Sequence, residues 1–164
     1  MIKQVCSEML EQRGYNITQS DEFLIGQKDE QNIIAFIKPS KLSILKLKEY
    51  ITLMGEHKLD HAIIVCTEIT PPARTAALSS KVIQLELFMN YELQYNITKH
   101  RFVPAPRRLT NNEVAAFKKT FVGNLPKLLY GKPIQKFYDY KRGDIIEITR
   151  NTGDMKEIVY RIVK

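Results

Sequence analysis

The sequence predicts an α/β domain over residues 1–95 and a small α+β domain over residues 96–164. Strand and helix patterns alternate in the first part, which is typical of a sheet that is at least partly parallel. A basic segment with several prolines, 99–108, then interrupts the pattern. The net charge also changes between the two parts. Residues 1–95 hold 10 basic and 12 acidic side chains, a net of −2, whereas residues 96–164 hold 15 and 6, a net of +9.

The chain is expected to open with an amphipathic helix that Gly14 ends. Two strands, 23–26 and 32–37, are expected next, with the polar turn 28–31 between them and Pro39 as the end of the second strand. The apolar positions of the helix follow the spacing of one helical face: Ile2, Val5, Cys6, Met9 and Leu10.

A second helix is predicted to end near Gly55, because its face repeats at helical spacing through Ile44, Leu47, Lys48, Ile51 and Met54. The continuous apolar run 61–66 indicates a strand that is buried on both faces. Thr70, followed by two prolines, is a helix-start signal with a hydroxyl cap, and it predicts a short helix over 73–78. Another strand is expected over 82–88.

The second part begins with the proline-containing segment 99–108, which we expect to be a linker. Thr110 and Glu113 form a capping-box pattern that predicts a helix to about Phe121. Leu125-Pro126 is expected to start a short helical turn that Pro133 stops or redirects.

The end of the chain is expected to form a β-hairpin. The residues 141–143 indicate a tight turn that leads into a strand over 144–149. A loop over 151–156 and a strand over 158–163 follow. The second domain is therefore predicted to be a helical pair packed on a hairpin or small sheet.

The composition favours a soluble, intracellular protein with a buried core, since 44% of its residues are hydrophobic. The first residues lack the pattern of a signal peptide. No stretch approaches the ~20 apolar residues of a membrane span. Cys6 and Cys66 lie in apolar stretches, so we expect two buried, reduced thiols.

The sequence does not indicate a catalytic, metal or cofactor site. The three histidines follow no ligand spacing, and there is no glycine-rich phosphate loop. One enzymatic alternative is a metal-dependent nuclease, in which Glu56-His57-Lys58 would act with Asp21 or Asp29. Because that triplet follows Gly55 at a helix end, a solvated helix terminus is the favoured interpretation.

Several segments are candidates for contact with nucleic acid. The helix start Thr70–Arg74 offers backbone N–H groups beside an arginine, although ordinary capping explains it without a ligand. Phe137-Tyr138, with Tyr140 close behind, would stack on bases or, more in keeping with the nearby strands, pack in a core or interface. Four basic residues of the linker are also candidates for contact with phosphates: Lys99, Arg101, Arg107 and Arg108.

Segments along nearly the whole chain resemble a known family in the same order. The first half of the resemblance lies in Arg13-Gly14-Tyr15, Ala62-Ile-Ile-Val65, Thr70-Pro71, Ala76-Ala77-Leu78, Glu92-Leu93, Asn96-Ile97-Thr98-Lys99-His100 and Val103-Pro104. The second half lies in Leu125-Pro126, Pro133, Phe137-Tyr138, Lys141-Arg142-Gly143, Ile148, Arg150 and Tyr160-Arg161. The chain is similar to the fifth-largest subunit, which eukaryotic nuclear RNA polymerases I, II and III share. Its C-terminal part is also similar to a small subunit of archaeal RNA polymerase.

This resemblance implies a non-catalytic subunit of a multisubunit DNA-directed RNA polymerase. The N-terminal domain would be a jaw with a nuclease-like, three-layer fold that has no active site. Its segment matching Thr70, Pro71, Pro72, Ala73 and Arg74 would lie near downstream duplex DNA and contact it without reading its sequence. The C-terminal domain would dock on the largest subunit through Pro133, Phe137, Tyr138, Lys141, Arg142, Gly143, Arg150, Tyr160 and Arg161.

The chain departs from the family's pattern in several places. The segment between the first helix and the first strand is short, Lys132 and Asp139 replace an acidic residue and a glycine, and Asn151-Thr-Gly-Asp154 replaces a longer stretch in the hairpin. These departures suggest a divergent polymerase, with a large DNA virus of eukaryotes as the favoured source. The expected location is the nucleus for a cellular protein, or a virion or cytoplasmic factory for a viral one. A free-standing DNA-binding factor is a further alternative.

Overall fold

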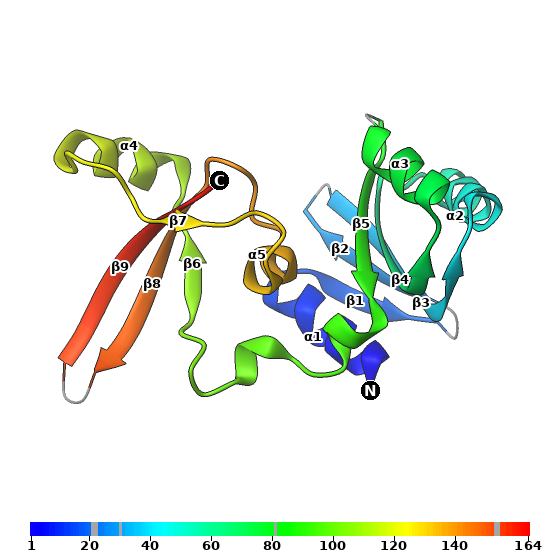
Figure 1. Ribbon diagram of the computed structural model, residues 1–164, viewed down its shortest axis with the longest axis horizontal. Coiled ribbons are helices and arrows are strands. Elements are labelled where there is room, and N and C mark those ends of the chain that lie inside the picture. The colour runs from blue at the N-terminus through cyan, green and yellow to red at the C-terminus, as the bar shows by residue number, and fades with distance from the viewer. Residues whose placement is uncertain (21–22, 30, 81, 153–154) are drawn as a thin grey trace. The chain divides into compact units, whose positions relative to one another are not determined.

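The computed structural model describes residues 1–20, 23–29, 31–80, 82–152 and 155–164. Contacts between Cα atoms divide the chain into two compact units, Met1–Asn96 and Ile97–Lys164, called unit 1 and unit 2 below. Figure 1 shows both units with their helices and strands labelled. No helix among the described residues is long and apolar enough to cross a membrane.

Unit 1 contains a five-stranded sheet in which the strands follow the chain order β1-β2-β3-β4-β5. The first three strands pair antiparallel, and β3, β4 and β5 pair parallel, so the expected partly parallel sheet is confirmed. The strands are β1 (Asn16–Gln19), β2 (Phe23–Lys28), β3 (Gln31–Leu42), β4 (His61–Ile69) and β5 (Gln84–Met89).

Helices cover both faces of this sheet (Figure 1). Alternate residues of β3 and β4, such as Ile34 and Ile64, pack in one cluster with α2 (Ile44–Glu56) and α3 (Pro71–Ser79). On the other side, α1 (Ile2–Gln12) buries its predicted apolar face and contacts β1 and β3. Residues 62–66 of β4 are all buried, as the unbroken apolar run predicted. Unit 1 is therefore a helix–sheet–helix sandwich.

The end of α1 is fixed by Gly14, as predicted. Gly14 has φ +88°, a conformation that favours glycine because it lacks a Cβ atom. The N–H groups of Gly14 and Tyr15 donate to the carbonyls of Glu11 and Leu10 at 2.8 and 3.0 Å, which is the Schellman pattern. Cys6 on this helix and Cys66 on β4 are both buried, and neither is in a disulfide. Burial raises the pKa of Cys6 to about 12, so its thiol stays protonated.

Two predictions for unit 1 are wrong at the ends of strands. Pro39 does not end β3, which continues to Leu42. The register with β4 shifts between Phe36 and Ser40, and an irregularity of this kind tolerates a residue without an N–H. The strand expected over 82–88 begins instead at Gln84.

Unit 2 contains a four-stranded sheet with the order β6-β8-β9-β7. The hairpin β8 (Ile145–Thr152) and β9 (Met155–Val163) forms its centre, and both strands extend into the range 151–156 that was predicted to be a loop. Gly153 and Asp154 lie outside the described residues. The edge strands are β6 (Pro106–Arg108), which pairs antiparallel with β8, and β7 (Lys127–Leu128), which pairs parallel with β9.

Three predictions for unit 2 are corrected around prolines. The expected linker 99–108 ends in β6, where Pro106 takes the first strand position. Leu125-Pro126 precedes the strand β7 and starts no helical turn. Pro133 starts a helix rather than stopping one, because it occupies the first position of α5 (Pro133–Tyr138), where the missing N–H costs nothing.

The capping box at Thr110 is confirmed. Thr110 Oγ1 accepts a hydrogen bond from the Glu113 N–H at 3.4 Å, and Glu113 Oε2 accepts one from the Thr110 N–H at 2.8 Å. This reciprocal pair begins α4 (Asn111–Thr120), which has no buried residue. Short 3-10 turns precede unit 2 at 90–93 and open it at 97–99.

Candidate functional site

The candidate DNA-contact segment forms the beginning of α3 in unit 1. Thr70 is the N-cap residue, and Pro71 and Pro72 are the first two helical positions. Both prolines and Arg74 are exposed, whereas the Ala73 methyl is buried in the core cluster with α2. Ala73 can therefore meet a ligand only through its backbone.

The backbone of this segment offers fewer donors than the sequence suggested. The prolines have no N–H, and the N–H groups of Thr70 and Arg74 donate to the carbonyls of Leu42 and Thr70, both at 3.0 Å. The expected hydroxyl cap is absent, because Thr70 Oγ1 donates to Leu42 O at 3.3 Å. At most the N–H of Ala73 remains, so the exposed guanidinium of Arg74 is the group suited to a phosphate.

The expected turn at Lys141-Arg142-Gly143 in unit 2 is confirmed. Gly143 has φ +92°, and the Lys141 N–H donates to Asp144 Oδ2 at 2.8 Å. All three turn residues are exposed. The Arg142 guanidinium lies over the Tyr130 ring, 4.5 Å from its centroid, and this contact holds the cation at the surface.

The aromatic residues of α5 pack within the protein. Phe137 is buried and meets Tyr138 edge-on at 5.4 Å between ring centroids, while Tyr138 stacks on Tyr140 at 5.3 Å. Burial raises the pKa of both tyrosine hydroxyls. The favoured interpretation, packing rather than stacking on bases, agrees with this arrangement. Among the docking candidates here, Pro133 is exposed and Phe137 supports the surface from inside.

The remaining docking candidates lie on the hairpin. Arg150 is exposed on β8. Tyr160 donates its hydroxyl to Glu147 Oε2 at 3.2 Å, and Arg161 donates from Nη1 to the Lys127 carbonyl at 3.3 Å. Because Tyr160 and Arg161 are consecutive in a strand, their side chains point to opposite faces of the sheet. One flat partner surface would therefore not contact both side chains.

The nuclease triplet lies away from any strand. Glu56 is the last residue of α2, and Glu56, His57 and Lys58 are all exposed. Asp29 lies in the exposed turn after β2, and Asp21 falls outside the described residues. The position of the triplet agrees with a solvated helix terminus.

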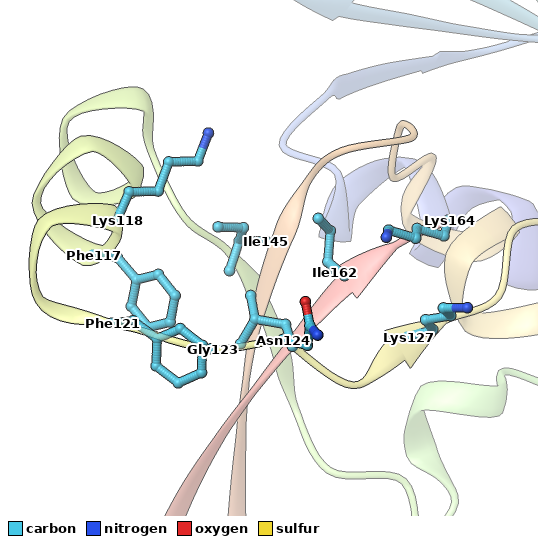
Figure 2. A pocket seen from close by; sticks show the side chains of 10 residues that line it. Phe117, Lys118, Phe121, Gly123, Asn124, Lys127, Ile145, Ile162 and Lys164 are labelled. Atoms are coloured by element: carbon cyan, nitrogen blue, oxygen red, sulfur yellow. The ribbon is translucent and has the colours of Figure 1, made fainter.

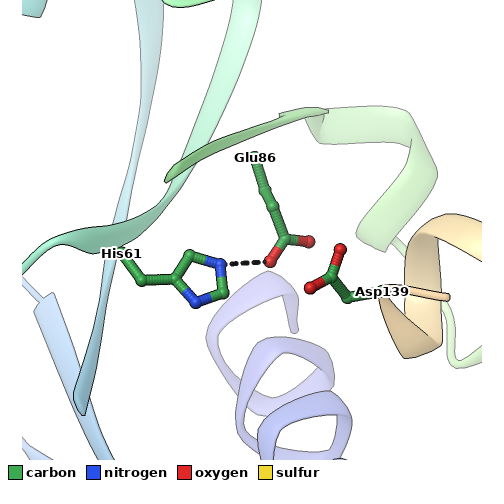
Figure 3. A group of neighbouring side chains, drawn as sticks. All are labelled: His61, Glu86 and Asp139. Carbon is green, nitrogen blue, oxygen red and sulfur yellow. Dashed lines mark hydrogen bonds and ion pairs between the residues drawn. The ribbon is translucent and has the colours of Figure 1, made fainter. Parts of the chain in front are cut away.

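Unit 1 contains a buried ion network that no sequence pattern indicated. Arg13 forms two hydrogen bonds of 2.8 Å with the Glu86 carboxylate, and His61 Nε2 lies 2.7 Å from Glu86 Oε1. The dashed line in Figure 3 marks this contact between His61 and Glu86. Burial raises the pKa of Glu86, but the charge of Arg13 and the hydrogen bonds outweigh it and lower the pKa to about 2.

Unit 2 contains a pocket that the sequence did not indicate either. It has a volume of about 510 Å³ and lies between α4, the following segment and the sheet (Figure 2). The segments that line this pocket are far apart in the sequence, so no local pattern indicated it. It is lined by Phe117, Lys118, Phe121, Gly123, Asn124, Leu125, Lys127, Ile145, Ile162 and Lys164.

Comparison with known proteins gives matches over both units. The family model described as "RNA polymerase Rpb5, C-terminal domain" matches residues 95–163. A putative DNA-directed RNA polymerase subunit, 454R, of Invertebrate iridescent virus 6 is 30% identical, over 98% of this chain and 97% of the relative.

Two cellular relatives are similar as well. The DNA-directed RNA polymerases I, II, and III subunit rpabc1 of Dictyostelium discoideum is 27% identical over 98% of this chain and 94% of its own length. The subunit RPABC1 of Caenorhabditis elegans is 30% identical over 82% of this chain and 66% of its own length. The matches confirm the resemblance seen in the sequence: the chain belongs to the Rpb5 family of RNA polymerase subunits.

Proposed function

We propose that this protein is a non-catalytic subunit of a multisubunit DNA-directed RNA polymerase. The observation that carries this proposal is the similarity to the viral polymerase subunit over 98% of the chain, which includes both units. Relatives from a slime mould and a nematode are named as subunits shared by three polymerases. A protein with this ancestry acts within an assembly.

Unit 2 is proposed to dock on the largest polymerase subunit. The family model covers this unit, and residues 96–164 carry the net charge of +9. The exposed turn at Lys141 and Arg142 and the exposed Pro133 are the first contacts we assign to the docking surface. An acidic partner surface would complement them.

Unit 1 is proposed to be a jaw domain that guides downstream duplex DNA. The helix–sheet–helix arrangement supports the nuclease-like fold that the family resemblance implies. The start of α3 presents Pro71, Pro72 and the Arg74 guanidinium at the surface. A contact of this kind with phosphates positions a duplex without reading its sequence.

The setting follows the source of the polymerase. In a cell the subunit would work in the nucleus, as the names of the relatives shared by polymerases I, II and III suggest. In a large DNA virus it would work in the virion or in a cytoplasmic factory. The similarity to the iridescent virus subunit supports the viral source.

Affinity purification of the tagged full chain from its native source tests the proposal. We expect the two largest polymerase subunits to co-purify at salt concentrations that remove loosely bound nucleic acid, and mass spectrometry identifies them. Nuclease treatment of the lysate separates assembly from shared attachment to DNA. Recovery of the tagged chain without either large subunit would overturn the proposal.

A further inference from the structure

We propose that the pocket between α4 and the sheet of unit 2 binds a partner polypeptide segment that presents a large apolar side chain flanked by carboxylates. This inference rests on the pocket itself and does not require the proposed function. We call the site formed by these ten lining residues the α4 pocket.

The interior of the α4 pocket is apolar on two sides. Phe117 of α4 stacks on Phe121, the C-cap residue of this helix, with 5.0 Å between the ring centroids. Figure 2 shows these rings on the helix side, with Ile145 and Ile162 of the sheet facing the same space. Phe121 is exposed, and so is Val122 beside it. A large apolar side chain entering here would remove this surface from water, which is favourable.

Contacts from two positions of α4 attach the helix to the sheet beside the pocket. Arg107 of β6 bridges Glu113 on the helix, at 2.8 Å, to Glu147 on β8, at 3.1 Å. Phe117 rests against Tyr160 at 4.7 Å between ring centroids. These contacts fasten α4 to the sheet, although no residue of α4 is buried. A partner would therefore meet a preformed site.

The charge around the α4 pocket is positive. Lys118, Lys127 and Lys164 line it, whereas no aspartate or glutamate side chain does. Within the described part of the chain, no ion pair includes these lysines. Four acidic side chains of unit 2 already have cationic partners: Glu113 and Glu147 with Arg107, Asp144 with Arg108, and Asp139 with Lys141. Carboxylates on a partner would complement the lysines of the pocket.

The same features favour a polypeptide over nucleic acid. Single-stranded nucleic acid stacks its bases on open aromatic faces. Here one face of Phe117 is already stacked on Phe121 and the ring also packs against Tyr160, so a base would not find both faces of this ring open. Arginine, the side chain that grips phosphate with two hydrogen bonds, is absent from the lining. A pocket lined by both large apolar side chains and three lysines matches an acidic segment with an apolar anchor.

Fluorescence anisotropy with the full chain tests this proposal. The probe is a fluorescein-labelled peptide in which one phenylalanine and one leucine are flanked by aspartate and glutamate. We expect Lys118→Glu and Lys127→Glu each to weaken binding roughly fivefold or more, because each places a negative charge beside the probe's carboxylates. Phe121→Ala should weaken binding as well. The matched control is Lys119→Glu, which changes the charge equally on the same helix but outside the lining.

The control variants and probes decide the outcome. Equal weakening by Lys118→Glu and Lys119→Glu would overturn the proposal, since general attraction would then explain the binding. Unchanged binding of a probe with alanine in place of its apolar residues would overturn it too. The proposal would also be overturned if a labelled single-stranded oligonucleotide bound more tightly than the peptide and if Lys118→Glu and Lys127→Glu weakened that binding. Thermal unfolding of each variant verifies that the fold is intact, and co-purification with polymerase is scored separately.

Discussion

The two units each contain an arginine–carboxylate network, and they place it differently. In unit 1, the Arg13 and Glu86 side chains are 5% and 12% exposed, and His61 completes the network between α1 and the sheet. In unit 2, the Arg107 and Glu113 side chains are 51% and 40% exposed. Unit 1 uses its network inside the fold, whereas unit 2 uses one at the surface to fasten a helix that has no buried residue.

The hydrophobic cores differ in the same direction. One hydrophobic cluster of unit 1 joins β2, β3, β4, β5, α2 and α3, whereas a cluster of unit 2 centres on Tyr140, Ile146, Ile148 and Val163. A small core supports fewer elements independently of a partner. The difference teaches that unit 1 packs several helices and strands around a buried cluster, while unit 2 packs fewer elements around its own.

Disrupting the core of unit 2 should abolish assembly, whereas disrupting the core of unit 1 should not. This is the largest effect that we predict. Ile146→Asp places a charge in the core of unit 2, where Ile146 is fully buried, and should abolish assembly with the polymerase. Truncation after Asp139, which removes β8 and β9, should do the same. The matched variant Ile64→Asp should unfold unit 1 and leave assembly intact. Co-purification and circular dichroism measure both effects.

The opposite pattern would break the comparison. If the chain truncated after Asp139 still co-purified with polymerase, the domain roles proposed for the two units would be wrong. If Ile64→Asp abolished assembly as completely as Ile146→Asp, unit 1 would share the docking function.

Breaking the buried network should destabilise unit 1 more than changing an exposed carboxylate does. Glu86→Gln leaves the buried Arg13 charge without its partner, which typically costs about 3–5 kcal/mol in the free energy of unfolding. Urea denaturation at neutral pH measures this change. The control Glu56→Gln alters an exposed carboxylate of the same unit and should change the free energy by less than about 0.5 kcal/mol.

The pH dependence of unfolding gives the same network a second test. The pKa of Glu86 lies near 2 in the folded protein and near 4.5 ordinarily. Its stabilisation is thus fully present above about pH 5 and is lost as the pH falls through 4.5 toward 2. The native protein should lose stability over this acidic range, and Glu86→Gln should lose less. Equal losses of stability in both proteins would show that the ionised Glu86 carboxylate does not stabilise the fold as described.

The sequence predicted the elements whose signals are local. Helical spacing located α1 and α2, the apolar run located β4, and the capping box at Thr110 located α4. Signals at prolines were ambiguous, because the same missing N–H suits a helix start at Pro133 and a strand edge at Pro106. The effect of Pro39 depended on the register with β4, which no local pattern contains.

The candidate sites were predicted less completely for a related reason. The Arg13–Glu86 pair joins residues 73 positions apart, and the α4 pocket joins Phe117 to Ile162, so only the folded chain brings them together. The helix-start pattern indicated Thr70–Arg74 as a phosphate contact, and the family resemblance strengthened that prediction and assigned the docking residues. It could not show that Thr70 and Arg74 use their N–H groups internally.

Removing the N-cap hydroxyl of α4 should lower the stability of unit 2 by a moderate amount. Thr110→Ala removes the hydroxyl that accepts from the Glu113 N–H, and loss of such a cap typically costs about 1 kcal/mol. The matched control is Thr120→Ala at the other end of α4, where the hydroxyl donates to the Ala116 carbonyl and caps no free N–H. Urea denaturation followed by a probe in unit 2 compares them. Equal effects would mean that the cap does not fasten the helix.

The smallest effect concerns the exposed cation of unit 1. The net charge of +9 lies in unit 2, yet the proposed DNA contact is Arg74 in the unit with a net of −2. Arg74→Ala should weaken retention of downstream duplex by the assembled polymerase roughly fivefold or less, since one phosphate contact is lost, and the slope of affinity against salt should fall by about 1. Lys119→Ala removes the same charge from unit 2 and should change neither. If Lys119→Ala weakened retention more than Arg74→Ala, the unit with the excess positive charge would be the one that faces DNA.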